Sequence, residues 1–198
     1  MLDVIAAPDA KGRTPDWHAL PLAAPSFAEA LERPLPKLKI AFAPQINNIK
    51  MNRDVAAVMD AQMKHLRALG RVDVIRLDMP DIIDVFNKHW MAVAAHMLRG
   101  YTPAQKKKTD PRLAHWAARG EKLALHDYLA AERARMDIGA AFKALLDDYD
   151  ILVTPTTAMT AFDAGSNMPK DAQGRPWEDW TPFTYGANLA RLPAASIP

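Results

Sequence analysis

The chain has no cysteine and, among its 198 residues, only eight glycines and three serines. The absence of cysteine excludes a disulfide framework, a thiol nucleophile and a thiolate metal site. It fits a reducing compartment, so we expect a cytoplasmic location. The glycines are scattered and never adjacent. Because no glycine-rich loop is available to cradle a phosphate, we expect no nucleotide, flavin or other cofactor.

A strong charge of one sign and long apolar runs are also lacking. The 25 Lys and Arg residues nearly balance the 23 Asp and Glu residues, and a net charge of +2 gives no general reason to bind nucleic acid. No apolar run approaches the roughly 18 residues that span a bilayer, and the first residues lack the pattern of a secretory signal. The 49% hydrophobic content instead predicts a soluble packed globule with no membrane partner.

The placement of proline predicts two regions. Most of the 16 prolines fall in residues 8–45 and 155–198. Residues 1–37 contain several turn formers, and we interpret them as a linker with one short helix, which Ser26 can cap and Pro34 prevents from continuing. Residues 38–198 are predicted to form one α/β segment.

The first part of this segment has the pattern of a βαβ unit. Residues 38–42 and 72–77 are short apolar or alternating runs that predict strands. Between them, Asn52 can cap a helix that Gly70 would end. Helical spacing predicts that one side of this helix faces the core: Val55, Met59, Met63, Leu66 and Leu69. A strand, a helix and a strand within about forty residues indicate parallel strands.

Two long amphipathic helices are predicted next, from Asp81 to Arg99 and from Lys122 to Tyr149. Their expected buried sides are Ile82, Val85, Phe86, Trp90, Val93, Ala94 and Met97 in the first, and Leu125, Tyr128, Leu129, Ala131, Met136, Ile138, Phe142 and Leu145 or Leu146 in the second. The second helix contains Gly139, which marks a bend or close packing rather than an end. Residues 101–112 between them are polar and contain two prolines, and we expect Lys106, Lys107 and Lys108 to form a solvated loop.

Residues 150–154 (DILVT) predict one more short strand, ended by Pro155. The whole pattern predicts the α/β class, with a mixed β-sheet flanked by helices.

Two stretches carry a more specific pattern. The second long helix contains Tyr128, Leu129, Ala131 and Arg135 in a Tyr-Leu-x-Ala-x-x-x-Arg arrangement, and residues 149–156 read Tyr-Asp-Ile-Leu-Val-Thr-Pro-Thr. Further on, residues 181–184 read Thr-Pro-Phe-Thr and are followed by Asn188 and by Pro-Ala at 193–194. In order and spacing these stretches resemble the amidase-signature hydrolases. The resemblance covers nearly the whole chain and is strongest after about Ala124.

The resemblance implies hydrolysis of a linear carbon–nitrogen amide bond, through a serine, a second serine in a cis peptide, a lysine and a glycine-rich loop of oxyanion donors. The serines here are Ser26, Ser166 and Ser196, and none lies in a Gly-Ser-rich stretch. A serine hydroxyl is a poor nucleophile until a base takes its proton. We therefore expect no catalytic residue in this chain, and interpret it as an incomplete, C-terminal segment of an amidase that is inactive alone.

The resemblance also implies that Trp180, Thr184 and Asn188 bind substrate. Thr156 is a fourth candidate on a different ground, because it follows the strand at 150–154, and binding residues are usual where strands end in open α/β sheets. Trp180 belongs to an aromatic group with Trp177, Phe183 and Tyr185 that would form an apolar wall, although core packing explains such residues equally well. Asn188 would supply hydrogen bonds. The expected ligand is a small-molecule amide, bound only in the complete enzyme.

A different class of function stays open, namely a non-catalytic binding or assembly module on an amidase-like scaffold. Without an upstream core, apolar surface would be exposed on the strands and on the helix from Asp81. Either a homo-oligomer or a complementing N-terminal half would cover it.

Two polar clusters have simpler interpretations. His89 and His96, with Asp84, suggest a metal site, but ligands seven residues apart on one helix are not typical, and surface or half-buried histidines are favoured. The aspartates at 147, 148 and 150 suggest acid–base chemistry, yet a solvated turn explains them better. We expect no metal.

Overall fold

The computed structural model describes residue 3 and residues 26–166, 168–170, 177 and 180–197. The chain divides into two compact units, Met1–Lys37 and Leu38–Pro198. In the first unit the predicted short helix is present as α2, Phe27–Leu31, and the Ser26 hydroxyl caps it by accepting a hydrogen bond from the Glu29 N–H at 3.2 Å.

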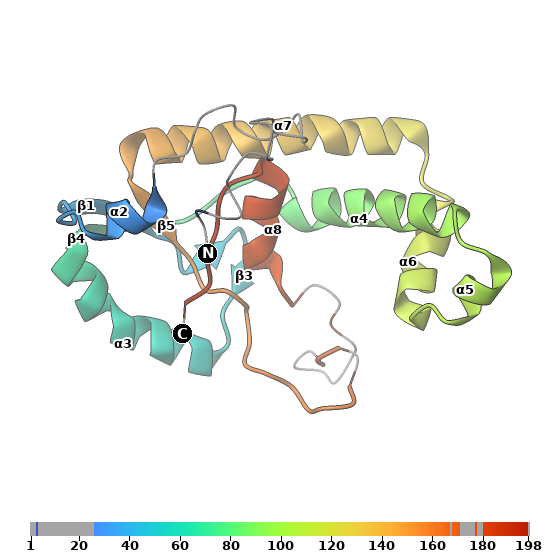
Figure 1. Cartoon of the computed structure of the whole chain (residues 1–198), viewed down its shortest axis with the longest axis horizontal. Helices are drawn as coiled ribbons and strands as arrows, with labels where there is room; N and C mark the ends of the chain where they lie inside the picture. The colour runs from blue at the N-terminus through green and yellow to red at the C-terminus, as the bar shows by residue number, and fades with distance from the viewer. Residues whose placement is uncertain (1–2, 4–25, 167, 171–176, 178–179, 198) are drawn as a thin grey trace. The chain divides into compact units, whose positions relative to one another are not determined.

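The central sheet of the second unit has the order β4-β1-β5 and is parallel throughout (Figure 1). Its strands are β1, Leu38–Phe42, β4, Gly70–Val74, and β5, Ile151–Val153. In the register Leu38 pairs with Gly70, and Ile40 with Ile151. The α/β class and the parallel βαβ unit are confirmed. Antiparallel pairing occurs in a separate ribbon of β2, Gln45–Ile46, and β3, Ile49–Lys50.

Asp150 fixes the register of β5 at its first rung. Its carboxylate accepts a hydrogen bond from the Lys39 N–H at 2.7 Å, and its own N–H donates to the Lys39 carbonyl at 2.9 Å. This aspartate, weighed above as an acid–base candidate, thus has a structural role. Asp147 of the same cluster pairs with Lys143 at 2.9 Å.

Helix α3, Arg53–Leu69, joins β1 to β4 and has the predicted Asn52 cap. The predicted side is the less exposed one, since Val55, Met59, Met63 and Leu66 are half-buried, but no residue of α3 is fully buried and Leu69 is 39% exposed. The helix contacts the edge strand β4, and a three-stranded sheet is too narrow to cover a whole apolar side. Strand β4 begins at Gly70, two residues earlier than predicted, and directly follows the last residue of α3. Gly70 packs so closely on the Leu38 backbone that a Cβ atom at this position would clash with it.

Helix α4, Ile82–Arg99, matches the predicted range, with Asp81 as its N-cap and Gly100 as its C-cap. Its buried side is only partly the predicted one, because Trp90, Val93 and Met97 are exposed. Met91, Ala95 and Leu98 are buried instead. The reason is the neighbouring helix α6, Pro111–Gly120, which packs against α4 around Ala94, Leu98 and Ala117.

The lysines at 106–108 are exposed, as predicted, but the first two belong to a helix and not to a loop. The polar stretch 101–112 contains α5, Pro103–Lys107, and the start of α6, Pro111–Gly120. Both helices begin with proline in the first turn, and Thr102 and Gln105 form a reciprocal capping box. Proline is favoured at the first position of a helix, so the two prolines of this polar stretch mark helix starts.

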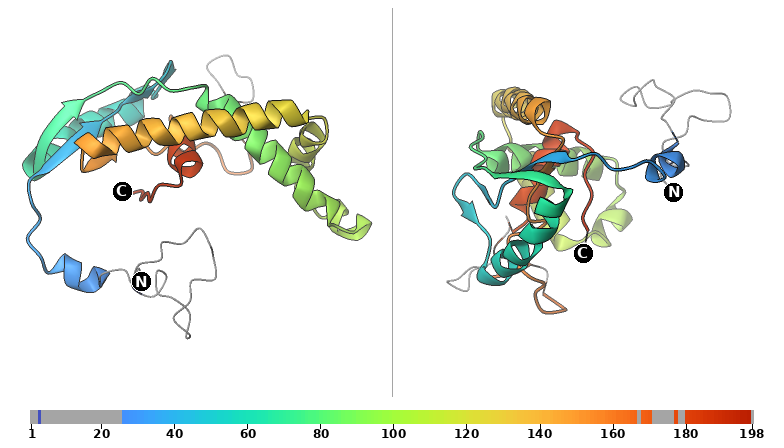
Figure 2. Two further views of the ribbon diagram at one scale, coloured as in Figure 1. Left: turned by 90° about the horizontal axis from the view of Figure 1, so that it is seen from above. Right: turned by 90° about the vertical axis from the view of Figure 1, so that its left-hand side faces the viewer.

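Helix α7, Leu125–Asp148, runs without interruption through Gly139, and helix α8, Pro182–Ala190, follows the last loop. Of the side predicted to be buried in α7, Ala131, Ile138 and Phe142 are buried, whereas Leu125, Leu129 and Met136 are exposed. Helices α4, α7 and α8 contact one another and lie together in Figures 1 and 2. The main core lies among them and the strands: Ile82, Val85, Ile138, Phe142, Phe183, Tyr185 and Leu189. None of the helices in the described parts of the chain is long and apolar enough to cross a membrane.

Gly186 sets how closely α8 approaches α7. A Cβ atom at this position would lie 2.5 Å from the ring of Phe142, which is itself buried, and 3.3 Å from Ile82. We predict that Gly186→Ala lowers the free energy of unfolding by about 1–2 kcal/mol, because overpacking a filled core forces neighbours to shift. Urea denaturation followed by circular dichroism measures this change.

Gly139→Ala is the matched control on α7. No atom lies within 4 Å of the added Cβ, and the position is inside a helix. The same measurement should show stabilisation of about 0.5–1 kcal/mol, since alanine loses less backbone entropy than glycine. Equal effects of the two substitutions would contradict the close approach of α8.

Candidate functional site

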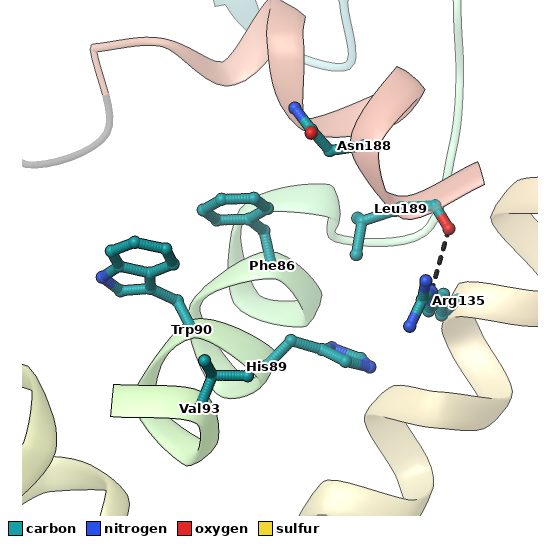
Figure 3. Close-up of a pocket in the computed structure, with 7 residues that line it drawn as sticks. All are labelled: Phe86, His89, Trp90, Val93, Arg135, Asn188 and Leu189. Carbon is teal, nitrogen blue, oxygen red and sulfur yellow. Dashed lines mark hydrogen bonds between the residues drawn. The ribbon is translucent and has the colours of Figure 1, made fainter. Parts of the chain in front are cut away.

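A small pocket lies where α4, α7 and α8 meet. Its volume is about 220 Å³. Helix α4 provides one side, and residues from α7 and α8 complete it. The lining residues are Phe86, His89, Trp90, Val93, Arg135, Asn188 and Leu189 (Figure 3).

The apolar part of the pocket comes mainly from two aromatic rings of α4. Phe86 stacks on the buried Tyr185, with ring centroids 3.8 Å apart and planes within 3°. Trp90 continues this stack at 6.3 Å from Phe86 and is 46% exposed. Phe86 is therefore held by the core, while Trp90 has a free surface against which an apolar ligand group can pack.

A hydrogen-bonded network holds His89 at the edge of the pocket, although the other two side chains of the network, Tyr128 and Glu132, do not line it. His89 lies one turn from Val85, whose carbonyl is 2.7 Å from Nδ1, and its Nε2 is 2.8 Å from Glu132 Oε1 on α7. The Tyr128 hydroxyl donates to the same Glu132 oxygen at 3.1 Å. The network joins α4 to α7 and fixes the orientation of the imidazole at the edge of the pocket.

The network perturbs two ionisable groups. Desolvation raises the pKa of Glu132, but hydrogen bonds from His89 and Tyr128 and the charges of His89 and Arg135 outweigh it and hold that pKa below its usual value. Desolvation and the hydrogen bond to Glu132 raise the pKa of the Tyr128 hydroxyl. Glu132 is therefore a stable carboxylate at neutral pH.

Arg135 joins α7 to the end of α8. Its Nε donates to the Leu189 carbonyl at 2.9 Å, near the C-terminus of α8, where a positive charge is favourable. Its Nη1 is 3.7 Å from Glu132 Oε1, too far for a hydrogen bond. Figure 3 shows Arg135 and His89 on one side of the pocket and the aromatic rings on the other.

Two of the four residues predicted to bind substrate lie together on α8. Asn188 lines the pocket and is exposed, and its Nδ2 donates to the Thr184 carbonyl at 2.9 Å. The Thr184 hydroxyl donates to the Thr181 carbonyl at 2.9 Å, so its proton is used within the helix. In Figure 3 the Asn188 amide points away from Arg135.

The other two residues do not line this pocket. Thr156 follows β5 and is exposed, with its Oγ1 2.9 Å from the Ser196 hydroxyl. Trp180 is half-buried, and its ring lies edge-on to Phe162 with centroids 5.4 Å apart.

Core packing accounts for most of the aromatic group around Trp180. Phe183 and Tyr185 are buried, and Trp177 packs on the same core. The pocket residues that the sequence did not reveal as binding residues come from α4 and α7, together with Leu189 of α8. Trp90 and Val93 were assigned to the core by spacing, and their exposure depends on where α6 and α8 pack.

None of the hydrogen bonds formed by serine hydroxyls in the described residues activates a nucleophile. The Ser26 hydroxyl caps a helix, and the Ser196 hydroxyl bonds another hydroxyl group. His89, interpreted above as an ordinary surface or half-buried histidine, uses both ring nitrogens within the network. In the part of the chain that the structure describes, no three histidine or acidic residues are grouped to hold a metal ion.

Comparison with known proteins gives a family for this scaffold. The family model described as Amidase matches residues 1–198. The chain belongs to the Amidase family.

Among curated proteins, this Amidase-family chain is 25% identical to an acylamidase of Rhodococcus erythropolis over 100% of its own length and 42% of the relative. It is 24% identical to a fatty acid amide hydrolase of Medicago truncatula, over 79% of the chain and 27% of the relative. The chain also matches a glutamyl-tRNA(Gln) amidotransferase subunit from a Synechococcus strain, at 26% identity over 100% of the chain and 44% of the relative. It thus spans less than half of these relatives.

Solved structures share the fold. A bacterial aryl acylamidase of the amidase-signature enzymes matches with a TM-score of 0.66 at 17% identity, over 85% of this chain and 38% of that one. A 6-aminohexanoate cyclic dimer hydrolase matches with a TM-score of 0.68 at 15% identity, over 90% of this chain and 41% of that one. The resemblance inferred from residues 128–194 is therefore confirmed at the level of family and fold.

The Glu132 network predicts a pH-dependent contribution to stability. Because the pKa of Glu132 is lower in the folded chain, its contribution is present above the ordinary carboxyl pKa and is lost as pH falls through the folded value. We predict that Glu132→Gln destabilises the chain by about 1 kcal/mol at pH 7, a figure reduced for partial exposure. Urea unfolding between pH 7 and pH 3 should show this difference narrowing on acidification.

Asp137→Asn is the control, since Asp137 lies on the same helix and pairs at 3.7 Å with the exposed Arg133. Exposed pairs of this kind contribute little, so its effect should stay below about 0.5 kcal/mol. A Glu132→Gln effect that is constant from pH 7 to pH 3 would show that the carboxylate charge is not what stabilises the network.

Proposed function

We propose that this chain forms part of an amide hydrolase, and that the pocket between α4, α7 and α8 receives an apolar group of the amide substrate. The observation that carries the proposal is the exposed face of Trp90 beside a polar corner, on a scaffold of the Amidase family. Small-molecule sites typically combine an apolar wall with a few fixed polar groups, and this pocket has both.

Hydrolysis needs a nucleophile that this pocket does not contain. Acyl transfer requires a hydroxyl paired to a base and donors for the oxyanion. No side chain of the pocket supplies an activated hydroxyl, and neither Ser26 nor Ser196 is bonded to a base. We therefore propose that the chain is inactive alone and that the nucleophile comes from a complementing segment, which corresponds to the part of the relatives that this chain does not match.

The names of the relatives suggest the substrate and the assembly. An acylamidase and an aryl acylamidase among them favour a small acyl or aryl amide. The amidotransferase relative is named as one subunit of its enzyme, which supports assembly with a second polypeptide here. The substrate-binding roles of Asn188, Thr184, Thr156 and Trp180 remain proposals, with Asn188 the one that reaches the pocket.

A chimera tests the proposal. In the Rhodococcus acylamidase, the part that matches this chain is exchanged for residues 1–198. We expect this chimera to hydrolyse a chromogenic anilide such as p-nitroacetanilide, and the isolated chain to show no turnover. Trp90→Ala in the chimera should raise KM about tenfold with little change in kcat, because it removes apolar contact with the bound substrate.

Leu129→Ala is the matched control, since Leu129 is similarly exposed at 56% but does not line the pocket. It should leave KM unchanged. Turnover by the isolated chain that disappears in Ser196→Ala would overturn the need for a complementing segment. An unchanged KM in Trp90→Ala would remove the pocket from substrate binding.

An assembly module is the second candidate, and exposed apolar residues on α7 favour it. Leu125, Leu129 and Met136 are 72%, 56% and 67% exposed, and their spacing puts them on one side of the helix. Such a stripe is typical of a protein interface. Sedimentation of the isolated chain, compared with Leu129→Glu, tests for a homo-oligomer, and an inactive chimera together with stable self-association would favour this function.

A further inference from the structure

We propose that Arg135 makes the pocket a binding site for a carboxylate that carries an aromatic or alkyl group. This inference rests on the proposed function in one respect, since it concerns the same pocket and names the class of ligand. Its basis is the hydrogen bonding of the guanidinium.

The guanidinium of Arg135 has more donors than the described residues satisfy. It carries five N–H groups, and the one hydrogen bond it makes within those residues is from Nε to the Leu189 carbonyl. The side chain is only 22% exposed, so water reaches the remaining donors over a small area. A planar guanidinium whose terminal nitrogens are available matches a carboxylate in a two-bond geometry.

The nearby Glu132 does not take up the terminal N–H groups of Arg135. Glu132 Oε1 already lies 2.8 Å from His89 Nε2 and accepts a hydrogen bond from the Tyr128 hydroxyl at 3.1 Å. Arg135 Nη1 is 3.7 Å from the same oxygen, which is within ion-pair range but beyond hydrogen-bond distance. The terminal nitrogens of Arg135 can therefore still donate to a ligand carboxylate.

The rest of the pocket determines what the carboxylate must carry. Phe86, Trp90, Val93 and Leu189 provide apolar surface beside Arg135, as Figure 3 shows. Asn188 adds an exposed amide at the rim. A volume of about 220 Å³ is below the roughly 300 Å³ at which pockets for drug-sized molecules begin, so the ligand is small.

A pair of nearly isosteric probes tests the charge requirement. We expect the 198-residue chain to bind 3-phenylpropanoate with a Kd on the order of 1 mM, as befits a fragment-sized ligand, and 3-phenylpropanamide at least tenfold more weakly. Calorimetry or ligand titration followed by NMR measures both. Chemical-shift changes should concentrate on the pocket-lining residues of α4, α7 and α8. Equal affinities, or shifts elsewhere, would overturn the proposal.

Arg135→Gln should remove the preference for the acid over the amide. Arg133→Gln is the matched control, because it removes the same charge two residues away on α7 from a side chain that is 77% exposed. It should keep the preference. If Arg135→Gln lowers the melting temperature too far for titration, Arg135→Lys keeps the charge but not the two-bond geometry and should weaken the acid about tenfold. A preference retained in the Gln variant, or an unweakened Lys variant, would contradict the proposal.

A third probe identifies the source of the carboxylate. Amide hydrolysis releases a carboxylic acid, whereas a substrate can also carry a carboxylate remote from its amide bond. N-phenylsuccinamate has both an amide and a remote carboxylate. Tighter binding than that of 3-phenylpropanoate would assign the site to the substrate, and weaker binding would assign it to the product. Because these titrations involve no turnover, their result is independent of whether the acylamidase chimera is active.

Discussion

The close contact of α8 with α4 and α7 is the constraint on which the candidate site depends. It requires a glycine at 186, where the backbone of α8 meets the Phe142 ring and Ile82. That approach stacks Tyr185 on Phe86 and brings the Leu189 carbonyl to Arg135. The pocket is thus a consequence of how three helices pack, and its aromatic side is the exposed continuation of the core.

Where local chemistry determines a structure, the sequence predicted it well. Caps at Ser26 and Asn52 located two helix starts, and the short apolar runs located the three strands of the central sheet. Which side of each helix is buried was less predictable, because it depends on which other helices and strands pack against it, and the spacing of apolar residues does not reveal these neighbours. Helix α6 buries the Leu98 side of α4, and no described element covers Leu129 on α7.

The site was predictable to a smaller extent for the same reason. Asn188 was found through a family pattern, but the polar corner is assembled from residues about forty to fifty positions apart. His89 and Glu132 meet because α4 and α7 pack side by side, and each looks like an ordinary surface residue in the sequence. Arg135 was noticed only as a family residue with a structural role. Its unused donors become apparent once the burial of its side chain and its bond to α8 are known.

The paired bonds between Asp150 and Lys39 also constrain the order in which the chain folds. They join residues 111 positions apart, and they begin the pairing of β5 with β1. Contacts with such large sequence separation form slowly, because the entropy of closing the loop is lost before the strand pairing compensates for it. The helices between the two strands can gain structure locally. We therefore expect β5 to pair with β1 later than β4 does, because one helix separates β4 from β1, whereas β5 follows only after α7.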